Sequence, residues 1–241
     1  MPVAVVTGVS RGIGAAVAES LLQAGFSVAG ISRTRSQRVE RFFDEHQEFV
    51  FHEVDLSDQA ATVQLATKLA ALPHSYTLLV NCAGMAQRKD LQELTADDWH
   101  HMFQVNVFSA AELTRRLLPA LLKGGHSSVI NIGSIAGSVG GRYQVHYAAA
   151  KSALENFSRS LNNLYSARGL RAFLVEVGQV DTDMMLPEIA ETGEGAIVSK
   201  IPIGRMGDPA EVGEVVRLIA TELPHFLGGQ TIRLNGGLNY G

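Results

Sequence analysis

Residues 3–14 read VAVVTGVSRGIG, and this stretch indicates how the chain begins to fold. The apolar and β-branched residues 3–7 are typical of a short buried strand. Gly8, Gly12 and Gly14 follow directly, so we expect the strand to turn at once into a helix. Such a turn lets the backbone approach a pyrophosphate, which the free N–H groups at the start of the helix can bind. The alternative is that these glycines make only a tight connection.

Composition favours one large α/β domain that covers residues 1–241, because 46% of the residues are hydrophobic and no repeat or linker is visible. The net charge of −4 gives no electrostatic footprint for nucleic acid, so no nucleic-acid partner is expected. Cys82 is the single cysteine and cannot form a disulfide within the chain. The first residues do not resemble a signal peptide, and no apolar run is long enough to span a membrane. We therefore expect a cytoplasmic protein without a membrane segment.

Strand-like and helical patterns alternate along the chain, which is typical of a parallel sheet with helices on both faces. The predicted fold is a Rossmann-type, doubly wound sheet of seven strands. We expect these strands at residues 3–7, 26–32, 49–54, 77–81, 127–134, 171–177 and 230–234.

Several helix ends can be predicted from capping residues. Residues 57–58 mark one helix start, and residues 208–211 combine a cap, a proline at the first helical position and an acid at the third. Residues 95–123 are expected to form one long helix, with Thr95 as its cap. Pro119 should kink or interrupt that helix.

The spacing of Tyr147 and Lys151 places a phenol and an ammonium on one face of a helix. A general acid or base that works near neutral pH needs a tyrosine pKa roughly 3 units below its ordinary value. One positive charge about 4 Å away, at an effective dielectric constant of about 20, supplies roughly the required 4 kcal/mol. The pair alone is not specific, because tyrosine and lysine also fall four residues apart on structural helices.

Two further polar residues strengthen the prediction. Ser134 ends the predicted strand 127–134, and the carboxyl ends of strands are where open α/β sheets bind ligands. Asn106 lies in an apolar neighbourhood, FQVNVFSA, where a buried amide needs partners. Asn106 can also be read as a purely structural amide.

These motifs together resemble the short-chain dehydrogenase/reductase family, and within it the β-ketoacyl-acyl carrier protein reductases. The matching segments run from residue 7 to residue 237 and are TGVSRGIG, NCAG, Asn106, Ser134, Tyr147-x-x-x-Lys151, GQVDT and GQTIRLNGG. The resemblance implies an NADPH-dependent ketoreductase that moves hydride to a substrate carbonyl, or the reverse. A dinucleotide-binding sensor or scaffold without turnover is the alternative.

The resemblance also implies roles for individual residues. Tyr147 would give a proton to the carbonyl oxygen, and Lys151 would lower the pKa of Tyr147 and bind the nicotinamide ribose. Ser134 would hydrogen-bond the carbonyl, and Asn106 would hold a water of a proton relay. The residues implied to bind the cofactor are Gly8, Ser10, Arg11, Gly12, Ile13, Gly14, Arg33, Asp55, Leu56, Asn81, Ala83, Gly84, Tyr147, Lys151, Gly178, Val180 and Thr182. No metal site is expected.

The choice of NADP(H) rests on charge at the end of the second strand. NAD-preferring relatives usually carry an acid there, whereas this chain has Ser32 followed by Arg33. A guanidinium can bind a 2′-phosphate with two hydrogen bonds. Arg11 is expected as a second contact, and the alternative is that Arg33 and Arg35 are solvated loop charges, which is the favoured reading for Arg35.

Three places depart from the family or stay open. Cys82 replaces the usual asparagine and is read as a small buried residue, with a reactive thiol as the alternative. Val177 replaces the usual proline, so the loop after it could be looser. Residues 184–205 are expected to form a mobile flap over a substrate pocket, or else a surface hairpin whose methionines are core.

The substrate is expected to be a small-molecule carbonyl compound, either a β-ketoacyl thioester on acyl carrier protein or a free ketone. Relatives grip the acidic carrier with basic residues at two places, where this chain has Arg168 but also Gly125. A homotetramer is expected, with a dimer next, through the helix that bears Tyr147 and the carboxyl-terminal strand. The residues beyond the core-facing stripe of that helix are expected to include Ser152, Ala153, Phe157 and Leu161.

Overall fold

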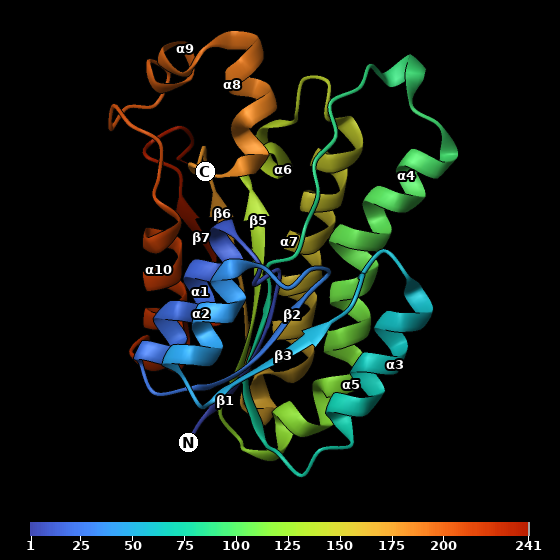
Figure 1. The fold of residues 1–241 in the computed structure, drawn as a ribbon, viewed down its shortest axis with the longest axis vertical. Coiled ribbons are helices and arrows are strands. Elements are labelled where there is room, and N and C mark those ends of the chain that lie inside the picture. The colour runs from blue at the N-terminus through green and yellow to red at the C-terminus, as the bar shows by residue number, and fades with distance from the viewer. Residues whose placement is uncertain (241) are drawn as a thin grey trace.

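The computed structural model describes residues 1–240, and seven parallel strands form its centre (Figure 1). The strands lie in the order β3-β2-β1-β4-β5-β6-β7, which confirms the predicted sheet. Their bounds are β1 Val3–Thr7, β2 Ser27–Ser32, β3 Phe49–Glu53, β4 Tyr76–Asn81, β5 Ser127–Ser134, β6 Leu170–Val177 and β7 Thr231–Leu234. Every neighbouring pair runs parallel, so all carboxyl ends of the strands meet at one edge.

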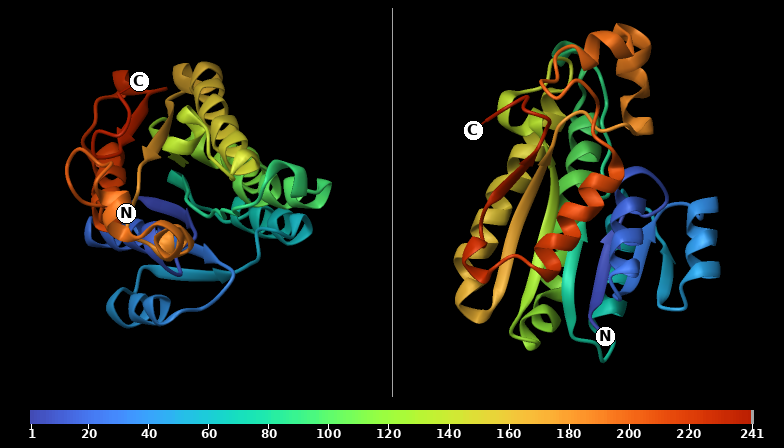
Figure 2. Two further views of the ribbon diagram at one scale, coloured as in Figure 1. Left: turned by 90° about the horizontal axis from the view of Figure 1, so that it is seen from above. Right: turned by 90° about the vertical axis from the view of Figure 1, so that its left-hand side faces the viewer.

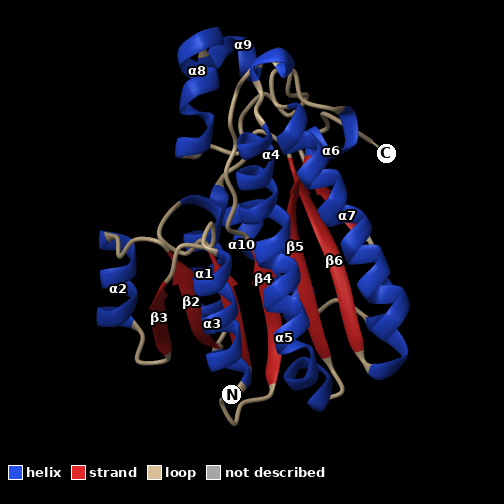
Figure 3. Ribbon diagram, turned by 90° about the vertical axis from the view of Figure 1, so that its right-hand side faces the viewer, coloured by secondary structure: helices blue, strands red, loops and turns tan. Residues whose placement is uncertain are grey.

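Two layers of helices cover the two faces of the sheet (Figures 2 and 3). One face carries α1 (Gly12–Gln23), α2 (Gln37–Glu45) and α10 (Pro209–Thr221), whose buried side chains join those of the strands in one core cluster. The other face carries α3 (Gln59–Ala70), α5 (Ser109–Lys123) and α7 (Val145–Tyr165), which share a second cluster. Alternate residues of β1 serve the two clusters, with Val6 in the first and Val5 in the second. This alternation is what a sheet covered on both faces requires.

The remaining elements are shorter, and two of them, α4 and η2, lead directly into α5. They are η1 Leu91–Glu93, α4 Ala96–Phe103, η2 Gln104–Phe108, α6 Ile135–Val139, η3 Ser166–Arg168, η4 Asp183–Met185, α8 Leu186–Thr192, α9 Glu194–Val198 and η5 His225–Leu227. In Figure 1, α8 and α9 stand above the carboxyl ends of the strands. Within residues 1–240, no helix has the length and apolar character needed to cross a bilayer.

The predicted helix caps are confirmed. Thr95 caps α4, and its hydroxyl accepts from the backbone N–H of Asp98 at 3.2 Å while the Asp98 carboxylate accepts from the Thr95 N–H at 2.8 Å. Asp208 and Glu211 form the same reciprocal arrangement at the start of α10. Each arrangement satisfies N–H groups that the first helical turn leaves without a partner.

The helical stretch predicted over residues 95–123 is present as α4, η2 and α5, but the interruption predicted at Pro119 is not there. The interruption is the π-helix η2, Gln104–Phe108, and Pro119 lies inside the continuous α5. A proline in a helix removes one backbone hydrogen bond. The helix continues through it because Leu117 and Leu121, on either side, are fully buried in the core.

Candidate active site

A cavity of about 850 Å³ opens at the carboxyl ends of the strands. Residues that follow β1 and residues that follow β4 both line it. These two strands are neighbours in the sheet, and the next strands after β1 lie on one side of the pair whereas those after β4 lie on the other. Such a switch point is where open α/β sheets bind ligands. The volume is ample for a dinucleotide-sized ligand and a small substrate.

The glycine turn after β1 forms a wall of this cavity that has no room for side chains. Gly8 has φ +81°, and a Cβ added to it would lie 3.1 Å from the backbone of Ala83. A Cβ on Gly14 would lie 2.2 Å from the carbonyl oxygen of Gly8. Thr7 holds the two turns together, because its hydroxyl accepts from the N–H groups of Cys82 and Ala83 at 2.9 Å each. The backbone is therefore fixed and open toward the cavity, which fits the phosphates of a dinucleotide.

Most of the residues predicted to bind a cofactor line this cavity. They are Gly8, Ser10, Arg11, Gly12, Ile13, Gly14, Arg33, Asp55, Leu56, Ala83, Gly84, Tyr147, Lys151 and Thr182.

Three predicted cofactor residues, Asn81, Gly178 and Val180, are not among those that line the cavity. The Asn81 amide donates to the Asn131 side chain at 2.8 Å, within a buried chain of hydrogen bonds that continues to Ser158. Gly178 packs against Asn235, and Val180 is buried beside Gly207. In this structure these residues support the walls of the cavity rather than line it.

Three arginines lie near the end of β2 and the glycine turn, in different electrostatic settings. Arg33 lines the cavity with its side chain 70% exposed, and its only ion-pair partner in residues 1–240 is Asp55 at 4.0 Å. Arg11 pairs with Asp183 at 3.1 Å, where both groups are exposed. Arg35 is held by both carboxylate oxygens of Glu40, at 2.6 and 2.9 Å. Arg33 is thus the cation most free to take another anion, because exposed pairs at such a distance contribute little.

Tyr147 and Lys151 lie on the first turns of α7, and both side chains are buried against the cavity. Lys151 Nζ donates to the backbone carbonyl of Ile132 at 2.9 Å and lies 5.7 Å from the centre of the Tyr147 ring. Ser134 caps α6, and its hydroxyl also hydrogen-bonds the Tyr147 phenol. The fold thus brings together the carboxyl end of β5 and the start of α7.

The prediction that Lys151 lowers the pKa of Tyr147 is wrong for this structure. Burial raises the pKa of the Tyr147 phenol above its ordinary value, and the hydrogen bond with Ser134 lowers it by less. Burial also lowers the pKa of Lys151 to about 8. The ammonium lies beside the ring and is bound to a carbonyl, so its charge does not offset the cost of removing a phenolate from water.

Asn106 lies in the π-helix η2, almost completely buried. Its amide nitrogen donates to the backbone carbonyls of Met85 and Met102 at 3.0 Å each, whereas its oxygen has no partner. A Cβ on Gly84 would lie 2.8 Å from that oxygen and 3.4 Å from Lys151 Nζ, so these two atoms face the same small space. An unpaired acceptor beside a buried ammonium is the place where a bridging water would bind.

The structure also shows the environments of Cys82, Val177 and the segment 184–205. Burial raises the pKa of the Cys82 thiol to about 12, which argues against the reactive alternative. Val177 lines the cavity, and the backbone after it is tied down where Gly178 donates to Leu234 and Asp181 donates to Gly207. In the segment 184–205, Met184 is 47% exposed and lines the cavity, so it is not a core residue.

Some residues that line the cavity were missed by the sequence analysis, among them Met85, Ala86, His101, Val105 and Pro187. Met85 and Ala86 follow the NCAG segment directly, and that position was a usable signal. His101 and Val105 come from helical segments whose inward face depends on the π-turn. In the described part of the chain, no group of three or more His, Cys, Asp or Glu side chains is arranged to hold a metal ion.

A glycine turn at the switch point, beside a buried tyrosine and lysine on one helix, is the arrangement of a dinucleotide-dependent oxidoreductase. The family model for short chain dehydrogenases matches residues 2–192, so the chain belongs to the short-chain dehydrogenase/reductase family. It is an NAD(P)-dependent oxidoreductase that acts on CH–OH or C=O groups.

Known relatives cover nearly the whole chain. The 3-oxoacyl-[acyl-carrier-protein] reductase FabG of Escherichia coli is 30% identical over 98% of this chain and 96% of its own length. FabG of Pseudomonas aeruginosa is 33% identical over the same shares.

A solved structure from Beutenbergia cavernae, a candidate NAD(P)-dependent gluconate 5-dehydrogenase with NADP bound at low occupancy, superposes with a TM-score of 0.92. It is 29% identical and covers 98% of this chain and 96% of its own.

Proposed function

We propose that this protein is an NADPH-dependent ketoreductase that reduces a 3-oxoacyl thioester on acyl carrier protein to the 3-hydroxyacyl form. The observation that carries the ketoreductase part is that Tyr147 and Lys151 line the same cavity as the glycine turn at residues 8–14, with Ser134 beside the Tyr147 phenol. The similarity to the 3-oxoacyl-[acyl-carrier-protein] reductases supports the substrate.

Each polar residue of the cluster has a role in this proposal. Bound NADPH supplies the hydride, and Tyr147 donates a proton to the carbonyl oxygen. The Tyr147 phenol is protonated near neutral pH, which is the form that reduction needs, and burial raises its pKa further. Ser134 donates a hydrogen bond to the same oxygen as negative charge develops there. Lys151 binds the nicotinamide ribose, and the free oxygen of Asn106 holds the water that returns a proton.

The cofactor preference is proposed from Arg33. Its exposed guanidinium lies at the cavity wall beside Ser32, where no acidic side chain follows the strand. One charge-assisted pair of hydrogen bonds to the 2′-phosphate contributes about 1.5–3 kcal/mol, which corresponds to roughly 10- to 150-fold in affinity. Arg11 adds a second contact if it leaves Asp183.

Substituting Arg33 tests this preference. Arg33→Ala should raise the KM for NADPH by about tenfold or more and leave the KM for NADH nearly unchanged, since only NADPH has the phosphate. Arg35→Ala is the matched control, because Arg35 is committed to Glu40. Equal losses with both cofactors would assign Arg33 a structural role, and a wild-type preference for NADH would overturn the assignment.

The substrate is tested by comparing a carrier-bound 3-oxoacyl thioester with its short pantetheine thioester. A specificity constant about tenfold or more higher for the carrier-bound form would support the carrier as partner, through contacts such as that of the exposed Arg168. Equal constants would remove the carrier and favour the second candidate, a free small ketone or secondary alcohol. The likeness to candidate gluconate dehydrogenases supports that second candidate.

A further inference from the structure

The loop before α7 holds a strained residue between two arginines. Tyr143 has φ +57°, the only positive φ of a non-glycine residue within residues 1–240. A bulky side chain reaches this conformation only at an energetic cost, and such strain gathers at binding sites. The guanidinium carbons of Arg88 and Arg142 lie 5.9 and 5.3 Å from the centre of the Tyr143 ring. The strained turn thus keeps an aromatic surface beside two positive charges.

Arg88 lies next to the mouth of the active-site cavity. Met85 and Ala86, three and two residues before it, line the cavity, and Pro187 lines it from the flap helix α8. Glu191 follows Pro187 by one turn of α8, and its carboxylate pairs with Arg88 at 2.8 Å. The Arg88 side chain is 25% exposed, whereas that of Glu191 is 56% exposed. The ion pair therefore spans the rim between the loop after β4 and the flap.

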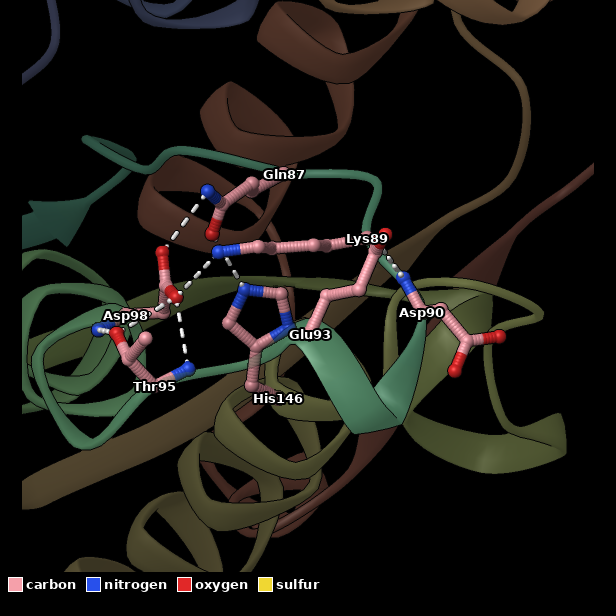
Figure 4. Close-up of polar contacts among 7 residues, drawn as sticks. All are labelled: Gln87, Lys89, Asp90, Glu93, Thr95, Asp98 and His146. Atoms are coloured by element: carbon pink, nitrogen blue, oxygen red, sulfur yellow. Dashed lines mark hydrogen bonds and ion pairs between the residues drawn. The ribbon is translucent and has the colours of Figure 1, made fainter.

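The loop that carries Arg88 is fixed on both sides of it (Figure 4). The side-chain oxygen of Gln87 accepts from His146 Nε2 at 3.0 Å, and the side-chain nitrogen of Gln87 donates to Asp98 at 3.0 Å. Lys89 pairs with Asp98 at 2.8 Å, and its backbone N–H donates to the carbonyl of Tyr143 at 2.8 Å. Asp98 is in turn held by Thr95 at the start of α4. Arg88 is thus presented by a rigid support, which lowers the entropy that binding would cost.

The donors and acceptors of these hydrogen bonds can be assigned from one another. Because the Gln87 nitrogen donates to the Asp98 carboxylate, its oxygen faces His146, and the facing ring nitrogen of His146 must be the donor. His146 immediately precedes Tyr147, so the same network joins the support of Arg88 to the residue proposed to donate the proton.

We propose that Arg88 is a specificity-determining residue that binds an anionic group of the substrate, a carboxylate or a phosphate, and that Glu191 occupies this position until the substrate displaces it. The proposal rests on the ketoreductase function. Arg88 is partly desolvated and needs an anion, whereas Glu191 is exposed on a helix of seven residues and returns to water at little cost. Arg142 adds a second positive charge beside the Tyr143 ring, with no carboxylate partner among the described residues.

Two sources of the anion are compatible with the proposed function. A free keto acid would bring its own carboxylate, and a carrier-type thioester would bring the phosphate of its pantetheine arm. Two substrate pairs distinguish them: acetoacetate with methyl acetoacetate, and 3-oxobutyryl phosphopantetheine with 3-oxobutyryl pantetheine. The members of each pair differ in charge near one end and share the reactive carbonyl.

The test measures kcat/KM for these four substrates. The wild type should prefer the charged member of one pair by about tenfold or more, and the pair that responds identifies the source. Arg88→Ala should remove that preference while changing the neutral member by less than about threefold, and Arg88→Lys should retain part of it, because lysine keeps the charge without the planar fork. Arg115→Ala, which removes an exposed arginine paired with Glu112 on α5, is the control and should change nothing.

The variant Glu191→Ala distinguishes two roles of the Arg88–Glu191 ion pair. If the substrate anion displaces Glu191, the variant should have a higher kcat/KM for the charged member, because a competing carboxylate is gone. If the ion pair only holds α8 in place, the variant should have a lower kcat/KM for charged and neutral members alike, and that result would overturn the proposal. Absence of charge preference in both pairs would overturn it too. The ketoreductase function has a separate readout, namely turnover of the two neutral substrates with NADPH.

Discussion

At the scale of single residues, Tyr147 shows how burial and hydrogen bonding set the form of an acid. The phenol is held protonated by burial and hydrogen-bonds Ser134. We expect Tyr147→Phe to lower kcat at least tenfold while the Kd for NADPH changes little, because phenylalanine keeps the ring packing and loses only the proton donor. Cofactor titration beside steady-state rates measures both quantities. A variant that keeps more than about a tenth of the wild-type rate would refute the assignment.

Lys151 makes the stability of the protein depend on pH. Its pKa is about 8 in the fold, compared with 10.5 as the ordinary value, because the ammonium is buried. Between these values the unfolded chain binds more protons than the folded one, so the free energy of unfolding rises with pH. The destabilisation that comes from burying the Lys151 ammonium is fully present below about pH 8 and is lost above about pH 10.5.

The variant Lys151→Met isolates this contribution. Relative to the variant, the wild type should gain roughly 3 kcal/mol in free energy of unfolding between about pH 7 and about pH 11. Urea unfolding of both proteins at several pH values measures the difference, and other titrating groups cancel in the comparison. A difference that stays constant with pH would mean that Lys151 titrates normally.

The residues of the site could be predicted from the sequence, but their electrostatics could not. Tyr147 and Lys151 were placed correctly on one helix next to the cavity. The direction of the Tyr147 pKa shift was not predicted correctly. It depends on how deeply the ring is buried and on the Ile132 carbonyl that binds the lysine. The contact of Arg88 with Glu191 joins residues more than a hundred positions apart, and no local pattern predicts it.

At the scale of elements, strands and caps were predictable because their signals are local. Each predicted strand is confirmed, with boundaries that shift by no more than one residue. The π-helix η2 was not predictable, since the same residues would form an ordinary α-helix and only tertiary packing selects the wider turn. That turn directs Asn106 toward Met85 and Gly84, so the unpredicted element is the one that shapes the site.

Pro119 offers a test of α5 as an element. Because the helix continues through this exposed position, Pro119→Ala should restore one backbone hydrogen bond and relieve a steric conflict. The free energy of unfolding should rise by about 1–2 kcal/mol. This value allows for the fact that proline restricts the unfolded chain and that alanine loses this benefit. Thermal unfolding should shift upward by a few degrees, roughly 2–4 °C per kcal/mol. A lower melting temperature would show that the proline fits the local backbone better than alanine does.

At the scale of the whole molecule, exposed apolar residues at two places are the candidates for the interfaces of the predicted homotetramer. Phe108 and Leu164, near the two ends of the α5–α7 face, are 48% and 67% exposed. The expectation that Leu161 belongs to this surface is wrong, because it is buried in the core of its own chain. The second surface is next to β7, the last strand of the sheet, where Phe226 is fully exposed. These residues are the positions at which we expect further subunits to pack.

Substituting one residue on each surface tests the assembly. If the two surfaces bury separate interfaces, Leu164→Glu and Phe226→Glu should each convert a tetramer into a dimer, since a buried unpaired carboxylate opposes association. The double variant should be a monomer. Val50→Glu, at a position of the opposite edge strand β3 that is 54% exposed, is the control and should leave the assembly intact. Light scattering at micromolar concentration reads out the mass, and a monomeric wild type would contradict the prediction.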